Sequence, residues 1–108
     1  MELLTDQALD LVASRFRLLA EPTRLKILQI LGHDEMTVTE IVERTGSSQA
    51  NVSKHLAALL SAAVVARRKN GLNAHYRVAD PSIFDLCDVV CSRLKDEVRN
   101  RRAIFGDE

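Results

Sequence analysis

The sequence has few cysteines and no apolar run long enough to cross a bilayer. Its 108 residues include two cysteines, and no stretch approaches the roughly 20 apolar residues that a membrane helix needs. The first six residues have neither the basic region nor the apolar region of a secretion signal. Thiols in such a chain are typical of a reducing compartment rather than of a disulfide framework. We therefore expect a cytoplasmic protein without a membrane partner.

Motifs typical of enzymes are also missing. The chain has no glycine-rich phosphate loop, no Cys-x-x-Cys pair and no base that a motif places beside either cysteine. A length of 108 residues suits one domain, and the elements described below use most of it. We therefore expect one domain over residues 1–108 that is not an enzyme.

Acidic residues are missing from one long stretch, residues 47–79. The whole chain has 15 basic and 15 acidic residues, but this stretch has only the five basic ones Lys54, Arg67, Arg68, Lys69 and Arg77. A basic surface without acids suits an anionic partner such as nucleic acid. The alternative is chance clustering of charge.

Helical spacing predicts two helices at the start of the chain. Apolar residues recur at helical intervals over residues 6–20, and Pro22 is expected to end that helix. Thr23 can then cap a second, buried helix that Gly32 closes.

A helix-turn-helix is predicted over about residues 37–61. Thr37 begins a capping-box motif at the start of a short helix, and Gly46 suits the left-handed end of that helix. Ser47 or Ser48 then caps a fourth helix with a polar outward face. Two short helices joined by a glycine turn are typical of a helix-turn-helix.

A basic β-hairpin is predicted over about residues 64–79. Asn70-Gly71 separates two short runs, and this dipeptide is typical of a type I′ turn, which needs positive φ at both central residues. In the second run Asn73, His75 and Arg77 alternate with apolar residues, so one face is polar and basic. Such a hairpin after a helix-turn-helix is the wing of a winged helix.

A long last helix is predicted over about residues 81–102, because Asp80 and Pro81 form a strong helix start. Its apolar face extends beyond what so small a core can cover, so we expect a second copy to bury the excess. The predicted fold is a winged helix-turn-helix, mainly α with a small β-hairpin. Its order is four helices, two strands and a helix, and it dimerises through the helices over residues 6–20 and 81–102.

Candidate DNA contacts lie on the fourth helix and on the hairpin. Helix N-terminal amides, hydroxyls and lysine hold phosphate, Gln and Asn amides read adenine, and arginine suits phosphate or the minor groove. The helix supplies Ser47, Ser48, Gln49, Asn51, Ser53, Lys54 and His55, and the hairpin supplies Arg67, Arg68, Lys69, Asn70, His75 and Arg77. The alternatives are a capped, solvated helix face and an edge strand that its charges protect from aggregation.

Cys87 and Cys91 are candidate inducer ligands on the last helix. Their i, i+4 spacing puts both sulfurs on one helical face, close enough for one soft ion or for joint oxidation. Two thiolates per chain are few for zinc, but they suit arsenite, mercury or a polysulfide. The candidate cofactor is therefore a thiophilic metal or metalloid ion. The alternative is that both cysteines are small buried apolar residues.

Three segments in order resemble the ArsR/SmtB family of winged-helix repressors. They cover residues 21–28 (EPTRLKIL), 48–56 (SQANVSKHL), and 65–71 (VARRKNG) with 75–81 (HYRVADP), within a resemblance that spans roughly residues 8–100. The resemblance implies a cytosolic homodimer, a pseudo-palindromic DNA operator and release from DNA when an inducer binds. Inducers in this family are usually metals, metalloids, or reactive sulfur and oxidant species.

The inducer sites that the resemblance implies are incomplete in this sequence. Residues 36–40, where the family often has Cys-x-Cys, contain no cysteine, and residues 27–31 lack the second-helix cysteine of persulfide sensors. The zinc positions of the last helix hold Asp80, Ser82, Arg93 and Asp96. We therefore predict a dimeric, sequence-specific repressor with Cys87 and Cys91 as its candidate sensor. The alternatives are a winged-helix protein-interaction module, or a constitutive DNA binder with structural cysteines.

Overall fold

The computed structural model describes residues 2–105, and it describes side chains up to residue 102. The elements in this part of the chain are α1 (Asp6–Leu19), α2 (Pro22–Leu31), β1 (Met36–Thr37), α3 (Val38–Thr45), α4 (Gln49–Ser61), β2 (Val65–Asn70), β3 (Asn73–Val78) and α5 (Ser82–Phe105). The predicted order of helices and hairpin strands is confirmed. The strand β1 was not predicted.

A small antiparallel sheet forms one side of the molecule. Its strand order is β1-β3-β2, and β3 pairs along its whole length with β2, from Val65 opposite Val78 to Asn70 opposite Asn73. β1 adds two residues at the other edge, where Met36 lies opposite Tyr76. Met36 and Tyr76 are both buried, so β1 attaches the sheet to the core.

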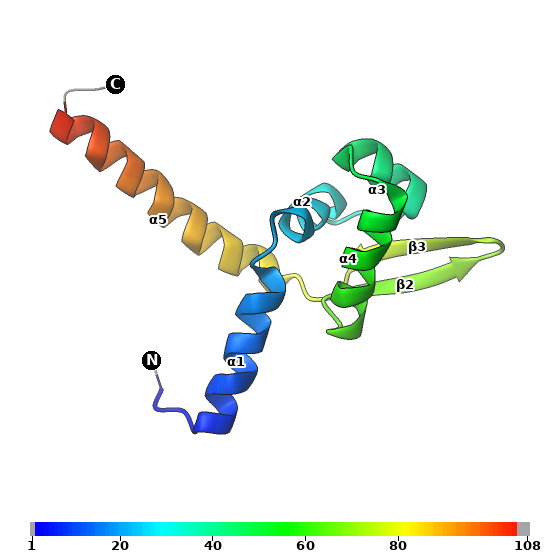
Figure 1. Cartoon of the computed structure of the whole chain (residues 1–108), viewed down its shortest axis with the longest axis horizontal. Coiled ribbons are helices and arrows are strands. Elements are labelled where there is room, and N and C mark those ends of the chain that lie inside the picture. Colours follow the sequence, from blue (N-terminus) through cyan, green and yellow to red (C-terminus); the bar gives the residue numbers. More distant parts are fainter. Residues whose placement is uncertain (1, 106–108) are drawn as a thin grey trace.

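The core lies between the sheet and the helices α2, α3 and α4. Its fully buried side chains are Ile27, Leu28, Leu31, Ile41, Val52, Leu56, Leu59, Val64 and Val65. The helices α1 and α5 extend away from this body in two different directions (Figure 1). Within the described side chains, α1 buries only Leu19 in the core and α5 buries only Ile83. No helix in the described part of the chain is both long and apolar enough to cross a membrane.

Local signals set the starts of the helices. Thr37 and Glu40 form the predicted capping box, and Gly46 ends α3 with a left-handed φ of 73°. Ser48, rather than Ser47, caps α4, since its side chain accepts a hydrogen bond from the backbone N–H of Asn51 at 3.1 Å.

The start of α2 differs from the prediction. α2 begins at Pro22, and Glu21 is its N-cap, so Thr23 lies inside the first turn and does not cap the helix. Proline is well suited to the first helical position because its fixed φ is helical and its missing N–H has no acceptor there.

The hairpin turn lies one residue later than the Asn70-Gly71 dipeptide predicts. Asn70 pairs with Asn73, so the two central residues are Gly71 and Leu72. Gly71 has a φ of 65°. Among the described residues other than glycine, only Ala63 has a positive φ, so the φ of Leu72 is negative. Positive φ at the first central position alone is the pattern of a type II′ turn. The predicted type I′ turn is therefore wrong, although the dipeptide does locate the hairpin.

Candidate nucleic-acid interface

The N-terminal half of α4 presents polar side chains to solvent. Gln49, Ser53 and Lys54 are exposed, as is the N-cap Ser48. Asn51 is half-buried, and its amide nitrogen donates a hydrogen bond to the Ser47 hydroxyl at 3.3 Å. The amide of Asn51 is thus already engaged by its neighbour. Gln49 is the exposed amide of this turn.

His55 is buried in the core, so its predicted outward position on α4 is wrong. Its exposed fraction is 5%, because Val52, His55, Leu56 and Leu59 form the inward stripe of α4 at helical spacing. Arg24 of α2 donates a hydrogen bond from Nε to Nδ1 of His55 at 3.0 Å. A polar ring can be buried here because this bond satisfies its acceptor nitrogen.

Burial lowers the pKa of His55, and the positive charges of Lys54 and Arg24 lower it further. The neutral ring is the form whose Nδ1 can accept a hydrogen bond from Arg24. Arg24 also donates from Nη1 to the backbone carbonyl of Leu18 at 3.0 Å. One guanidinium therefore joins the end of α1 and the middle of α4 to α2. Sequence reasoning missed this role of Arg24. The spacing of the inward α4 residues could have suggested that His55 is buried, but not which residue donates to it.

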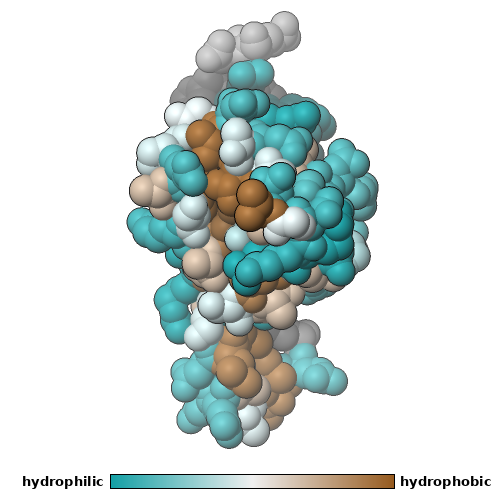
Figure 2. All heavy atoms as spheres, turned by 90° about the vertical axis from the view of Figure 1, so that its right-hand side faces the viewer, coloured by the Kyte–Doolittle hydropathy of each residue, from teal (hydrophilic) through white to brown (hydrophobic). Residues whose placement is uncertain are grey.

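The basic side chains of the wing, β2 and β3, are divided between its two faces. Arg68 lies opposite His75, and Arg67 lies opposite Tyr76. Because successive side chains of a strand point to opposite faces, Arg68, His75 and Arg77 share one face, while Arg67 lies on the face of buried Tyr76. His75 is half-buried, and the other predicted wing contacts are exposed, namely Arg67, Arg68, Lys69, Asn70 and Arg77. Seen from the side of the wing, much of the surface is hydrophilic, and hydrophobic residues form one patch in the upper middle of this face and another at the lower end, where α1 lies (Figure 2).

An acidic residue from outside the acid-free stretch lies against the wing. Arg68 donates hydrogen bonds to both carboxylate oxygens of Glu35, from Nη2 at 2.9 Å and from Nε at 3.3 Å. The hydrogen bond from Arg68 lowers the pKa of Glu35, and the charges of Arg68, His75 and Arg77 lower it further. The surface around the wing is therefore not free of acid, although residues 47–79 are. The missed signal is β1, whose pairing with β3 brings the preceding residue beside β3, so that the Glu35 side chain reaches Arg68 of β2 across that strand.

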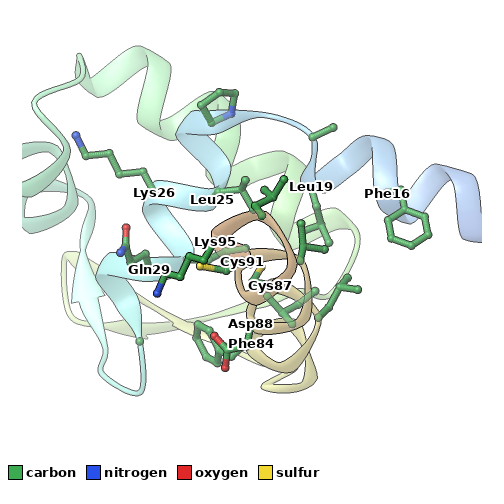
Figure 3. A pocket seen from close by; sticks show the side chains of 18 of the residues that line it. Phe16, Leu19, Leu25, Lys26, Gln29, Phe84, Cys87, Asp88, Cys91 and Lys95 are labelled. Atoms are coloured by element: carbon green, nitrogen blue, oxygen red, sulfur yellow. The ribbon is translucent and has the colours of Figure 1, made fainter. Parts of the chain in front are cut away.

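The two cysteines line an open groove of about 1360 Å³ between α5 and the body. Cys87 is half-buried and packs against the core, whereas Cys91 is exposed. Both lie on the side of α5 that faces α2, with Leu25 and Lys95 nearby (Figure 3). The predicted shared helical face is thus present, but the interpretation as two buried apolar residues fits Cys87 better than Cys91.

A metal site within one chain has too few ligands. Across the residues that the structure describes, no three His, Cys, Asp or Glu side chains gather closely enough to hold an ion. An ion bound by Cys87 and Cys91 would need further ligands from solvent, from a bound molecule or from a second copy of the chain.

Comparison with known proteins gives the following likenesses. A family described as a helix-turn-helix domain matches residues 19–68. A probable mercury resistance operon repressor of Streptomyces lividans is 46% identical over 77 residues, which are 71% of this chain and 62% of that protein. A transcriptional repressor SmtB homolog of Synechocystis is 32% identical over 91 residues, which are 84% of this chain and 68% of that protein.

A solved structure supports the same fold. The homodimeric winged helix-turn-helix DNA-binding domain (fragment 1–100) of a possible ArsR-family transcriptional regulator from Mycobacterium bovis matches with a TM-score of 0.73 and 31% identity. The match covers 89% of this chain and 92% of that one. The predicted winged-helix fold is therefore confirmed, and the relatives carry the names of regulators rather than of enzymes. The chain spans less than two thirds of the length of the S. lividans repressor and of one further curated relative.

Proposed function

The chain belongs to the ArsR/SmtB family of winged helix-turn-helix regulators, and from this we propose that it is a homodimeric repressor that binds double-stranded DNA. The observation that carries the proposal is the division of the surface. The exposed polar turn of α4 and the basic wing lie on one side of the body, and α1 and α5 leave from the other (Figure 1). One side suits an anionic duplex, and the other suits a second protein chain.

The proposed DNA contacts separate into base reading and phosphate binding. Gln49 is exposed at the start of α4, where a recognition helix places its first residues against base edges in the major groove. An amide of this kind reads adenine through two hydrogen bonds. Ser47, Asn51 and His55 have internal partners, so we assign them to the positioning of α4. We assign phosphate contacts to the exposed polar groups Ser48, Ser53, Lys54, Arg67, Lys69, Asn70 and Arg77, with His75 beside them.

A second copy of this chain is the proposed occupant of the groove along α5. Phe16 of α1 and Val90, Leu94 and Val98 of α5 are exposed by 53%, 51%, 53% and 47%, and all four line the groove. Burying such surface is favourable by about 25 cal/mol per Å² of apolar area. The related M. bovis domain is homodimeric. A two-fold dimer would present its two α4 helices about one turn of DNA apart, roughly 34–36 Å.

The cysteines are the proposed inducer site. Cys87 and Cys91 lie in the same groove that the second copy would cover, so four thiols per dimer lie close to the proposed interface. Arsenite, mercury and polysulfides react with thiolates. An adduct in the groove changes the packing of α5 on α2 and on its partner, and this change is the proposed route to release from DNA.

Fluorescence anisotropy on labelled DNA from upstream of the gene tests the proposal. Reduced protein is compared with protein exposed to arsenite, mercury, a polysulfide or peroxide, together with the variant Cys87→Ser/Cys91→Ser. We expect the reduced protein to bind, one reagent to release it, and the double variant to stay bound. Equal binding by both proteins under every reagent would refute the thiol site and leave the DNA-binding proposal intact. Binding of protein ligands without any preference for DNA would instead favour the interaction module.

A further inference from the structure

Glu35 brings a negative charge into the basic surface of the wing. It directly precedes β1, whose Thr37 lies opposite His75 of β3, and His75 lies opposite Arg68 of β2. These pairings put Arg68, His75 and the Glu35 carboxylate at one face of the sheet. Within the described residues, Glu35 is the only carboxylate that forms an ion pair with the wing.

The contact uses the part of Arg68 that would otherwise bind DNA. The Nε and Nη2 groups of Arg68 hold the two oxygens of Glu35 in a bidentate pair, and the same pair of donors is suited to two oxygens of a phosphate. The side chains of Arg68 and Glu35 are 55% and 33% exposed, so a phosphate has access to this position. Phosphate and the Glu35 carboxylate therefore compete for one guanidinium group.

We propose that Glu35 limits the DNA affinity of this protein by occupying Arg68 and repelling the phosphate that would replace it. This inference rests on the proposed DNA-binding function. The wing then binds DNA through its other basic side chains, while Arg68 remains paired with Glu35. Because each phosphate contact adds a fixed, salt-sensitive increment to binding, one occupied arginine lowers affinity for duplexes of any sequence. A repressor weakened in this way dissociates more readily when its inducer arrives.

The test is a salt titration of binding to a duplex of random sequence, read by fluorescence anisotropy. The variant is Glu35→Gln, which removes the charge and keeps the size of the side chain. The matched control is Asp34→Asn, which removes the same charge one residue away, where the carboxylate forms no ion pair or hydrogen bond with the described side chains. Both substitutions are repeated in an Arg68→Ala background, and circular dichroism verifies that each variant is folded.

We expect Glu35→Gln to bind more tightly than both wild type and Asp34→Asn, and its log–log salt slope to steepen by about 0.9, the value for one added phosphate contact. In the Arg68→Ala background we expect the two substitutions to have equal effects. Equal effects in the wild-type background would overturn the inference, because net charge alone would then explain the gain. Weaker binding by Glu35→Gln would also overturn it, by showing that Glu35 supports Arg68 in the complex. Wild-type protein that binds no duplex at any salt would refute the proposed function itself.

Discussion

Replacing Arg24 by alanine should destabilise the protein through two lost contacts. Arg24 donates hydrogen bonds to Nδ1 of His55 and to the carbonyl of Leu18, each at 3.0 Å. A hydrogen bond to a charged group contributes about 1.5–3 kcal/mol, and a buried acceptor left unsatisfied costs about 1–3 kcal/mol. The cost of leaving the His55 acceptor unsatisfied is already part of the cost of losing its hydrogen bond, so the two values are not simply added. We therefore expect the free energy of unfolding to fall by about 2–4 kcal/mol.

Urea unfolding followed by circular dichroism measures this change at fixed protein concentration. The matched control is Arg44→Ala, which removes an exposed arginine from the last turn of α3 and is expected to cost less than about 1 kcal/mol. The slope of the unfolding free energy against urea should stay unchanged, because the surface exposed on unfolding is the same. A loss for Arg24→Ala no larger than that of Arg44→Ala would refute the reasoning, since water would then be satisfying His55.

Stability should fall in acid, because burial lowers the pKa of His55 below its usual 6.5 in the folded chain. The contribution of His55 to stability is complete above the unfolded pKa. It is lost as the pH falls through the lower folded pKa. Urea titrations from pH 8 to pH 5 measure this, and His55→Gln should lose that part of the pH dependence. Gln49→Ala should reduce the preference for operator over random DNA by about 1–3 kcal/mol, whereas Lys69→Ala should weaken both duplexes alike and lower the salt slope by about one; equal behaviour of the two variants in competition binding would contradict the assignment. Leu94→Lys should give a monomer mass in light scattering at micromolar concentration, and a dimer mass would contradict the proposed interface.

Local chemistry made most of the fold predictable. The capping box at Thr37 and the left-handed Gly46 each act within one helical turn, where sequence spacing and spatial contact coincide. α5 begins at Ser82 rather than at the predicted Pro81, although the Asp80 carboxylate accepts hydrogen bonds from the backbone N–H and the hydroxyl of Ser82. The alternation along residues 73–78 likewise predicted which face of β3 turns inward, since Tyr76 is buried and Arg77 is exposed. These features depend on near neighbours in the chain, and a sequence displays near neighbours directly.

The missed features depend on partners that are distant in the sequence. His55 lies 31 residues from Arg24, and the sequence of its own helix does not show which residue donates a hydrogen bond to it. Glu35 lies 33 residues from Arg68, and its neighbour β1 is a two-residue strand, too short to show an alternating pattern. A polar residue at the edge of an apolar stripe can therefore point into the core or toward solvent. It is buried where the tertiary structure places a hydrogen-bond partner beside it.

The small share of α1 and α5 in the core has a consequence for protein level in the cell. Each of these helices buries a single residue in the core among the side chains described, so in the proposed dimer much of their ordering comes from the second copy. Folding and assembly are then one equilibrium, and the fraction of intact protein rises with total concentration by mass action. Newly made chains at low abundance would be the ones most open to proteolysis. A repressor built in this way has a threshold concentration below which it is both monomeric and short-lived. Its cellular concentration must exceed that threshold before repression begins.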